Sequence, residues 1–321
     1  MSSTQPAHSA ITEATFVTAN EVENTLNNNE VAVMASATGE GILYVVATPI
    51  GNLGDITTRA AQCLAQANTG LCEDTRVTAK LLQHLGLHKP LLALHNFNEH
   101  AISDKLVARL LAGEKLALVS DAGTPLISDP GFMLVRAARQ AGVKVEPIPG
   151  CCALITALCV SGLAVERFCF EGFLPSKRGE RRTALAQYLH ESRTVIVYES
   201  CHRIVDSLTD CMEVLGGQRQ ICIAREITKR FEQIVTLSLV EAVNWIQADD
   251  NRQRGEFVLI IEGAPAQAVC TDIVTVSVDV LLNKLRQHLP VKQVAQLAAE
   301  LTGQKKNALY QQMITQGVED V

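Results

Sequence analysis

Short apolar runs alternate with segments of helical spacing along the first half of the chain. The apolar runs have the length of buried strands and occupy residues 42–47, 70–72, 91–94, 116–119 and 143–148. Between them, apolar positions recur with helical spacing over residues 57–66, 77–85, 103–111 and 132–141. Strands that alternate with helices predict a largely parallel sheet with helices on both faces.

The pattern breaks at Pro149-Gly150, and a second set of elements follows. An apolar helix is expected over residues 153–160. From Phe168 onward we expect strands at 195–198, 221–224 and 257–262, with helices near 181–190 and 204–215. The sequence therefore predicts an α/β protein with two α/β domains of mostly parallel sheets, over residues 41–150 and 151–265.

Beyond an expected linker at residues 264–268, three short segments have helical spacing. They cover residues 280–287, 291–301 and 305–314. Three short helices joined by tight turns suit a small helix-turn-helix module over residues 275–321. A helical cap packed on the second domain is the alternative, and both interpretations stay open.

The first forty residues differ in composition from the rest of the chain. They are rich in Ser, Thr, Asn and Ala, and they contain five Glu but no Lys or Arg. We expect a disordered acidic tail without chemistry. The tail accounts for five of the six net negative charges, so the remaining residues are close to neutral.

The composition of the whole chain is ordinary for a soluble enzyme, with 47% hydrophobic and 19% charged residues. No apolar run approaches the ~18–20 residues of a membrane span. The first forty residues lack a basic start followed by an apolar core, so we do not expect them to be a secretory signal. The ten cysteines are scattered, without a zinc-like spacing. We therefore expect reduced thiols, a cytoplasmic location, no membrane association and no metal site.

Basic residues cluster in two places. Lys177, Arg178, Arg181 and Arg182 surround a single Glu, and Lys284, Arg286, Lys292, Lys305 and Lys306 lie near the C-terminus. Such clusters are either solvated faces or nucleic-acid contacts. The sequence leaves both interpretations open.

The segment 120–131 has the strongest chemical signal. It follows a predicted buried strand and combines Gly, Pro and Asp residues over twelve positions. A tight turn shaped by sterics alone is the competing interpretation, but plain connections in α/β units run about 2–6 residues. Exposed backbone N–H groups at a strand end favour a polar ligand instead.

Further polar segments follow other predicted strands, at residues 48–53, 72–76, 198–203 and 224–229. If the sheets are parallel, loops from both domains face one cleft, which is the usual place for a small ligand. Gly51 and Gly54 do not match a dinucleotide-binding GxGxxG, and no P-loop is present. Neither NAD nor ATP is therefore favoured as a cofactor.

Taken together, these segments resemble the tetrapyrrole-methylase-like superfamily and, within it, the bacterial RsmI family. The motifs that carry the resemblance are VATPIGNLGDIT (46–57), CEDTR (72–76), SDAGTPLISDPG (120–131), the Pro149-Gly150 turn, EGFLPSK (171–177), YESCHR (198–203), AREITK (224–229) and Gly255-Glu256. The chain departs from the pattern at Cys151-Cys152, where relatives commonly have Pro-Ser, and at Cys201, where many have Pro. Both changes keep small residues.

The resemblance implies a homodimeric enzyme that uses S-adenosylmethionine (SAM), bound in the cleft between the two domains. It also implies methylation of the ribose 2′-hydroxyl of a cytidine in the decoding region of small-subunit (16S) ribosomal RNA, with the small ribosomal subunit as partner. The family's cofactor positions correspond here to Asp121, Ala122, Gly123, Thr124, Cys152, Ala153, Tyr198, Ala224, Gly255 and Glu256.

Methyl transfer to a weakly acidic hydroxyl needs positioning and benefits from a base. We assign Asp74 and Glu199 as proton acceptors or orienting groups, and Arg76 and Arg203 as holders of the ribose-phosphate. Each pair has a structural alternative, an ion pair that fixes a loop or starts a helix. Glu73 and Glu226 are further candidate bases.

We expect RNA contacts from basic residues of both clusters and of one strand-end segment, namely Lys177, Arg178, Arg181, Arg182, Arg225, Lys229, Lys305 and Lys306. A tetrapyrrole-type small-molecule methyltransferase of the same fold is the alternative function. It would need neither the basic clusters nor the C-terminal helices. A non-catalytic nucleic-acid-binding regulator would leave the polar strand-end segments unexplained.

Overall fold

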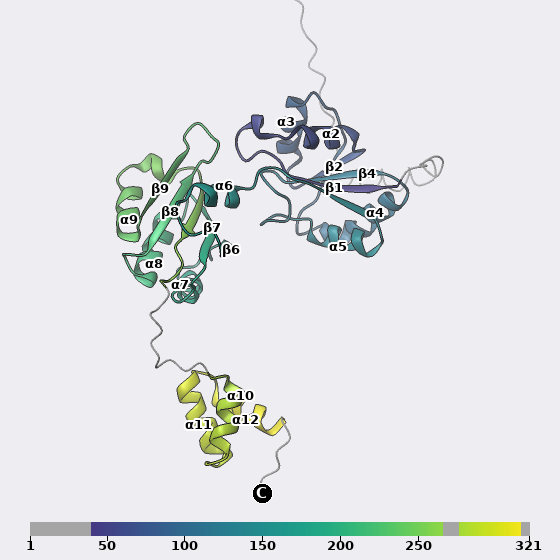
Figure 1. The fold of residues 1–321 in the computed structure, drawn as a ribbon. Coiled ribbons are helices and arrows are strands. Elements are labelled where there is room, and N and C mark those ends of the chain that lie inside the picture. The colour runs from purple at the N-terminus through teal and green to yellow at the C-terminus, as the bar shows by residue number, and fades with distance from the viewer. Residues whose placement is uncertain (1–39, 266–275, 316–321) are drawn as a thin grey trace, which may run out of the picture. The chain divides into compact units, whose positions relative to one another are not determined.

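The computed structural model of the chain describes residues 40–265 and 276–315 (Figure 1). These residues fall into two compact units that divide between Ala264 and Pro265. Two sheets with their helices make up the first unit, and helices make up the second. The expected tail before Glu40 and the expected linker beyond Pro265 lie outside the described residues. The predicted division of the first unit near residue 150 stays a prediction.

Every described pairing in the first sheet is parallel, as the alternation predicted, and the strand order is β3-β2-β4-β1-β5. Its strands are β1 (Ile42–Val46), β2 (Thr69–Cys72), β3 (Leu91–Ala93), β4 (Lys115–Val119) and β5 (Lys144–Ile148). A short 3₁₀ helix, η1 (Leu53–Asp55), follows β1.

Helices cover both faces of this sheet. Figure 1 shows α2 (Thr58–Gln66) and α3 (Thr75–His84) on one face, and α4 (Glu99–Leu111) and α5 (Phe132–Gln140) on the other. Side chains along β1 alternate between the two layers, because successive residues of a strand point to opposite faces. Tyr44 and Val46 pack in the core under α2 and α3, whereas Leu43 packs in the core under α4 and α5.

The second sheet is mixed, with strand order β6-β7-β10-β8-β9. Its strands are β6 (Phe168–Phe173), β7 (Thr194–Ser200), β8 (Gln220–Arg225), β9 (Gln233–Ser238) and β10 (Glu256–Ile261). β6 and β7 pair in parallel, whereas the β7–β10, β10–β8 and β8–β9 pairs are antiparallel. The α/β class is confirmed, but the expectation of a mostly parallel arrangement is wrong for this sheet.

A short connection explains part of this difference. Seven residues join β8 to β9, fewer than the dozen or more that a crossover to a parallel strand needs. The pattern also gave no prediction for β9 or for α9 (Leu239–Gln247), which follows it directly. A 3₁₀ helix, η2 (Asp250–Gln253), then leads into β10.

Two hydrophobic cores lie on the second sheet. The larger core joins the sheet to α7 (Arg178–Gln187), α8 (Ile204–Leu215) and α9. The smaller one joins the sheet to α6 (Ala153–Val160), and it also contains Ile50 from the loop after β1. Ile50 thus packs among side chains of the second sheet.

The C-terminal unit consists, in its described part, of α10 (Val278–Arg286), α11 (Val291–Thr302) and α12 (Lys306–Thr315). The helices share a small core that contains Leu282, Val294, Leu309 and Met313. Gly303, in the left-handed conformation at φ 72°, ends α11. The three predicted helices are therefore present. None of the described helices of the chain has the length and apolar composition that crossing a bilayer would require.

Candidate functional site

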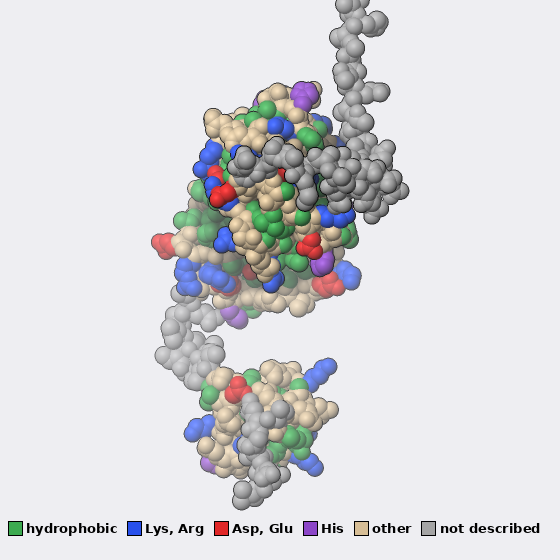
Figure 2. Space-filling model, turned by 90° about the vertical axis from the view of Figure 1, so that its right-hand side faces the viewer, with side chains coloured by type: hydrophobic (Ala, Val, Ile, Leu, Met, Phe, Trp, Pro, Cys, Tyr) green, Lys and Arg blue, Asp and Glu red, His purple; other side chains and the backbone are tan. Residues whose placement is uncertain are grey.

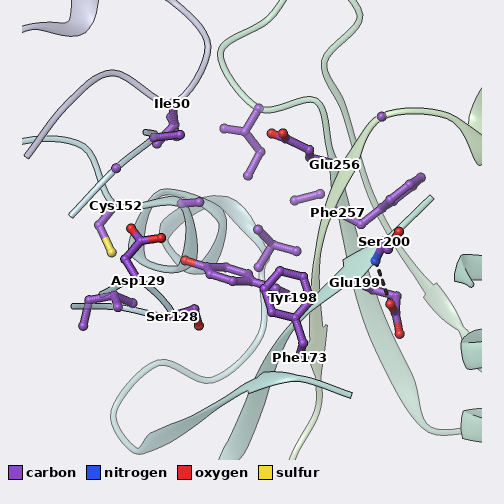
Figure 3. A pocket seen from close by; sticks show the side chains of 18 of the residues that line it. Ile50, Ser128, Asp129, Cys152, Phe173, Tyr198, Glu199, Ser200, Glu256 and Phe257 are labelled. Carbon is purple, nitrogen blue, oxygen red and sulfur yellow. Dashed lines mark hydrogen bonds between the residues drawn. The ribbon is translucent and has the colours of Figure 1, made fainter. Parts of the chain in front are cut away.

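A cavity of about 410 Å³ lies at the edge where strands of both sheets of the first unit end (Figure 3). Its volume falls within the ~300–1,000 Å³ that is usual for ligand sites. The ten residues predicted to bind a cofactor all line it. Their contact with a cofactor stays a prediction, but the fold brings these residues from five separate segments to one cavity.

The directions of the strands explain this convergence. In the first sheet, the carboxyl ends of β1, β2 and β4 meet at one edge because these strands are parallel. In the second sheet, β7 and β8 both run opposite to β10. Their carboxyl ends therefore meet the amino end of β10, where Gly255 and Glu256 lie. The antiparallel strand thus supplies its first residues to the cavity rather than its last.

Hydrogen bonds fix the loop after β4 to its neighbours. Thr48 and Gly123 exchange two backbone hydrogen bonds, Thr48 N–H to Gly123 O at 2.9 Å and Gly123 N–H to Thr48 O at 3.1 Å. The Thr124 hydroxyl donates to the Cys151 carbonyl at 2.9 Å. Leu126 and Ser128 adopt positive φ values of 73° and 66°, a conformation that surrounding structure must hold in place. The loop is therefore shaped before any ligand binds.

Two carboxylates of this loop line the cavity, and burial raises the pKa of both. Asp121 accepts a hydrogen bond from the Asp74 backbone N–H at 3.0 Å, and this bond partly offsets the increase in the pKa of Asp121. Asp129 accepts a hydrogen bond from the Ser120 hydroxyl, which lowers its pKa. The negative charges of Glu73 and Asp121 raise the pKa of Asp129 further. A cationic ligand in the cavity would lower both pKa values, because a nearby positive charge favours the ionised carboxylates.

Aromatic side chains form another part of the wall. Tyr198, at the end of β7, contacts Phe170 and Phe173 edge to face, with ring centroids 4.8 and 5.7 Å apart. Burial raises the pKa of Tyr198 to about 12, so its hydroxyl stays protonated at neutral pH. The cavity thus combines an apolar wall with a carboxylate-bearing loop, and Figure 3 shows Tyr198 facing into it.

The predicted catalytic pair Asp74–Arg76 lies beside the cavity rather than in its lining. The Asp74 side chain caps α3 by accepting from the Arg76 backbone N–H at 2.8 Å. It also binds the Arg76 guanidinium, with the shortest N–O distance at 2.6 Å. Hydrogen bonds from Arg76 hold the pKa of Asp74 at about 2. The Asp74 carboxylate is therefore ionised and already bound to the Arg76 guanidinium.

In the second predicted pair, Glu199–Arg203, Glu199 belongs to the cavity lining, but its carboxylate points away from the cavity. The Glu199 side chain is 0% exposed, and its Oε1 accepts from Arg203 Nη2 at 2.7 Å. The same oxygen accepts from the Ser200 backbone N–H at 2.6 Å (Figure 3), and Oε2 accepts from the Ser207 hydroxyl at 2.6 Å. Both oxygens are thus occupied in a buried network that ties β7 to α8. In this arrangement Glu199 cannot reach a substrate.

Several predicted RNA-binding residues are also held in internal contacts. Arg181 is 3% exposed and pairs with Asp210 at 2.7 Å. Burial works to raise the pKa of Asp210, but hydrogen bonds from Arg178 and Arg181 outweigh it and lower the pKa. The buried Arg225 donates to the carbonyls of Arg254 and Phe231. In this structure Arg181 and Arg225 are not accessible to a phosphate.

Lys229 is 26% exposed and is bound by the carboxylates of Glu226 and Glu256. The other members of that prediction are more accessible. Lys177 and Arg178 are exposed at the start of α7, and Arg182 is partly exposed while it pairs with Glu213. Lys305 and Lys306 are exposed at the start of α12. On the face shown in Figure 2, Lys and Arg side chains lie interspersed with acidic ones and do not form one continuous basic patch.

Some cavity-lining residues were not among the predicted site residues. They include Ile127, Ser128 and Asp129 in the second half of the loop after β4, and Phe173 and Ser200 from the second sheet. Asp129 carried a signal, since it stands in the same motif as Asp121. Phe173 and Ser200 stand in the motifs EGFLPSK (171–177) and YESCHR (198–203), but which residues of these motifs face the cavity depends on how the second sheet is built. Among the described residues, no cluster of three or more His, Cys, Asp or Glu side chains could hold a metal.

The architecture and the cavity define a class of protein. The family model of tetrapyrrole (corrin/porphyrin) methylases matches residues 42–243, and the model of the RsmI C-terminal HTH domain matches residues 273–317. The chain therefore belongs to the methyltransferases of the tetrapyrrole methylase fold. Within that class it belongs to the family of ribosomal RNA small subunit methyltransferase I.

Curated relatives carry this second assignment. The ribosomal RNA small subunit methyltransferase I of Pasteurella multocida is 52% identical over 271 residues, which is 84% of this chain and 96% of that protein. The protein of the same name from Escherichia coli O157:H7 is 50% identical over 279 residues, covering 86% of this chain and 96% of that protein.

Solved structures share the fold at much lower identity. Uroporphyrin-III-C-methyltransferase from Thermus thermophilus superimposes with a TM-score of 0.50 at 18% identity, covering 69% of this chain and 94% of that one. Cobalt precorrin-4 methyltransferase has a TM-score of 0.50 at 15% identity, with the same coverage. At such identities the likeness extends to the fold alone.

Proposed function

We propose that the chain transfers a methyl group from SAM to the ribose 2′-hydroxyl of a cytidine in the decoding region of small-subunit (16S) ribosomal RNA. Identity of 50–52% to proteins named ribosomal RNA small subunit methyltransferase I, over most of both chains, carries this proposal. The match to the RsmI C-terminal HTH domain supports it, because that module lies outside the shared methylase fold. Under this proposal the enzyme is cytoplasmic, binds RNA and acts as a homodimer.

The cavity lining fits SAM. The ligand carries an ammonium and a sulfonium, and Asp121 and Asp129 supply carboxylates whose ionisation a positive charge would favour. Small residues at Gly123, Ala153 and Ala224 leave room for backbone contacts. When bound, SAM would supply an electrophilic methyl group, and the chain's own residues would bring the ribose hydroxyl into line with it.

The accessible basic residues would hold the RNA. Lys177 and Arg178 at the start of α7 and Lys305 and Lys306 at the start of α12 are exposed. The described C-terminal residues 276–315 contain five Lys or Arg and two Asp or Glu, a balance that favours phosphate contacts. The tetrapyrrole alternative is not favoured, since the relatives with such names share only the fold.

The test uses the purified chain, tritiated SAM and small ribosomal subunits from a strain that lacks this methylation. Ribosomal RNA is digested after the reaction, and its nucleosides are separated. Label in 2′-O-methylcytidine is expected. SAM binding without label in RNA would contradict the proposal that RNA is the substrate and would favour a small-molecule acceptor. Light scattering on the same preparation measures the mass, which is expected to be that of a dimer.

A further inference from the structure

Three segments meet at the rim of the cavity around the side chain of Lys229. Lys229 Nζ lies 2.8 Å from Glu226 Oε1 and 2.8 Å from Glu256 Oε2. Glu256 lines the cavity. We refer to Glu226, Lys229 and Glu256 as the Lys229 cluster.

The backbone is shaped to hold this cluster. Glu226 N–H donates to Glu256 O at 2.9 Å, and Glu256 N–H donates to Glu226 Oε1 at 3.0 Å. Glu226 and Thr228 adopt positive φ values of 51° and 65°, which are uncommon for such residues and concentrate at functional sites. These two residues form a strained turn that leads to Lys229. A turn with ordinary φ values would place the Lys229 side chain elsewhere.

Two close approaches complete the cluster. A Cβ at Gly51, in the loop after β1, would lie 2.4 Å from Lys229 Cγ. A Cβ at Gly255 would lie 2.5 Å from Glu226 Cγ, and Gly255 has a φ of 98°. Both positions therefore require glycine. The first sheet contributes its own loop to the same rim, so the cluster forms where segments of both sheets pack together.

The two carboxylates of the cluster have different tasks. Glu226 is 17% exposed, and its Oε1 accepts from both Lys229 and the Glu256 backbone. Glu256 is 76% exposed, and Lys229 binds its Oε2. Within the described part of the chain, Glu256 Oε1 accepts no hydrogen bond. Glu226 thus anchors the lysine, whereas Glu256 presents an open oxygen at the cavity.

The charge states agree with these tasks. Burial works to lower the pKa of Lys229, but its hydrogen bonds to Glu226 and Glu256 outweigh burial and raise the pKa. Burial likewise works to raise the pKa of Glu226, but the hydrogen bond from Lys229 and that from the Glu256 backbone lower it. The lysine is therefore a fixed cation and not a base.

Four other acidic residues at or beside the cavity are less suited to accept a proton from a substrate. Glu199 is buried with both oxygens occupied, and Asp74 is bound by Arg76. Asp121 and Asp129 lie on the loop after β4, which the proposed function gives to SAM. Figure 3 shows Asp129 beside Cys152 and Ser128, on a different side of the cavity from Glu256.

We propose that the Glu256 carboxylate, instead of binding the cofactor as the resemblance implies, is the catalytic group that accepts the proton of the ribose hydroxyl, and that Lys229 positions it. This inference rests on the proposed function. As the hydroxyl oxygen bonds to the methyl carbon, the carbon–sulfur bond breaks with its electron pair left on sulfur, and the hydroxyl proton passes to the Glu256 carboxylate. Lys229 holds the carboxylate in place and offsets the negative charge that develops on the hydroxyl oxygen.

The test compares full-length E256Q, E256D, K229M and K229R with the wild type in single-turnover reactions on unmethylated small subunits. SAM binding is measured by calorimetry and subunit binding by filter retention. We expect E256Q to bind both within about threefold of the wild type and to react about 10²–10⁴-fold more slowly. E256D and K229R should react faster than E256Q and K229M, respectively. Matched controls are E146Q and K144M, which change an exposed ion pair on β5 and should leave the rate unchanged.

Two results would overturn the assignment. One is a rate for E256Q above one-tenth of the wild-type rate. The other is a loss of SAM binding in both E256Q and E256D, which would make Glu256 a cofactor ligand. Failure of the proposed function would be distinct from either, because the wild type and the controls would then bind SAM without labelling RNA.

Discussion

Replacing Glu199 by alanine should lower the stability of the protein before it affects any chemical step. The carboxylate is fully buried between β7 and α8. The change would leave the Arg203 guanidinium without its partner and remove the acceptors of the Ser207 hydroxyl and the Ser200 N–H. Each of these groups would have to find water or another acceptor at the edge of the larger core.

The size of the effect follows from this geometry. Removing one partner of a buried ion pair costs about 3–5 kcal/mol, and the lower end applies because Arg203 is about a quarter exposed and can reach water. For a domain of 150–250 residues, each kcal/mol shifts the midpoint of thermal unfolding by about 2–4 °C. A loss of about 3 kcal/mol therefore predicts a fall of about 6–12 °C.

Differential scanning fluorimetry and urea unfolding of E199A measure this fall, with E180A as control because Glu180 is exposed on α7. SAM binding measured well below the new midpoint should be close to normal, because the Glu199 side chain does not face the ligand. A midpoint within 2 °C of the wild type, together with a loss of methyl transfer above about 100-fold, would refute the structural role. It would restore Glu199 as a catalytic residue.

Other changes test the cavity and the RNA contact. Asp121→Arg should abolish SAM binding in calorimetry, because it places a cation where a cation is expected to bind. Asp129→Asn should weaken SAM binding about 10–100-fold yet raise the urea midpoint of the ligand-free protein at pH 7. The urea midpoint should rise because the folded state raises the pKa of Asp129, so ionised Asp129 destabilises the folded protein at pH values above that pKa. The stabilisation by Asn should disappear below the ordinary aspartate pKa of about 4, where Asp129 is protonated in both the folded and the unfolded state. Gly255→Ala should cost about 1–3 kcal/mol in unfolding experiments, since its φ is 98° and the added Cβ meets Glu226. Binding to small subunits should weaken at least about tenfold from 50 to 200 mM salt, whereas salt-independent binding would contradict the phosphate contacts.

The strand-end segments could be predicted from the sequence because their chemistry is local. Gly, Pro and Asp following a buried apolar run mark an open loop whichever way the neighbouring strands run. The parallel arrangement of the first sheet then follows from its intervening helices. The ten proposed cofactor positions came from the family resemblance, and the fold brings them to one cavity.

The orientation of Glu199 could not be predicted in the same way. Successive side chains of a strand point to opposite faces, so Glu199 shares its face with Val195 and Val197, which pack in the larger core. Tyr198 points the other way, toward the cavity. Tyr198 and Glu199 are adjacent in the sequence, and only the packing of the second sheet determines which of the two side chains faces the cavity.

The Lys229 cluster depends on a strand direction that the pattern did not reveal. The amino end of β10 lies beside the carboxyl end of β8 because the two strands are antiparallel. With the parallel arrangement that we expected, Glu256 would lie at the far end of the sheet from Lys229. Long-range pairing thus decides which charged residues meet, although each residue was visible as a candidate.

The shared lining of the cavity also has a thermodynamic consequence. A ligand that fills the cavity contacts residues of both sheets, so opening of either sheet would destroy its binding site. At a concentration one hundred times its dissociation constant, such a ligand adds about 2.7 kcal/mol to the free energy of unfolding. That contribution opposes the partial unfolding of each half equally, so a saturated enzyme should melt as one cooperative unit and resist proteolysis in both halves together.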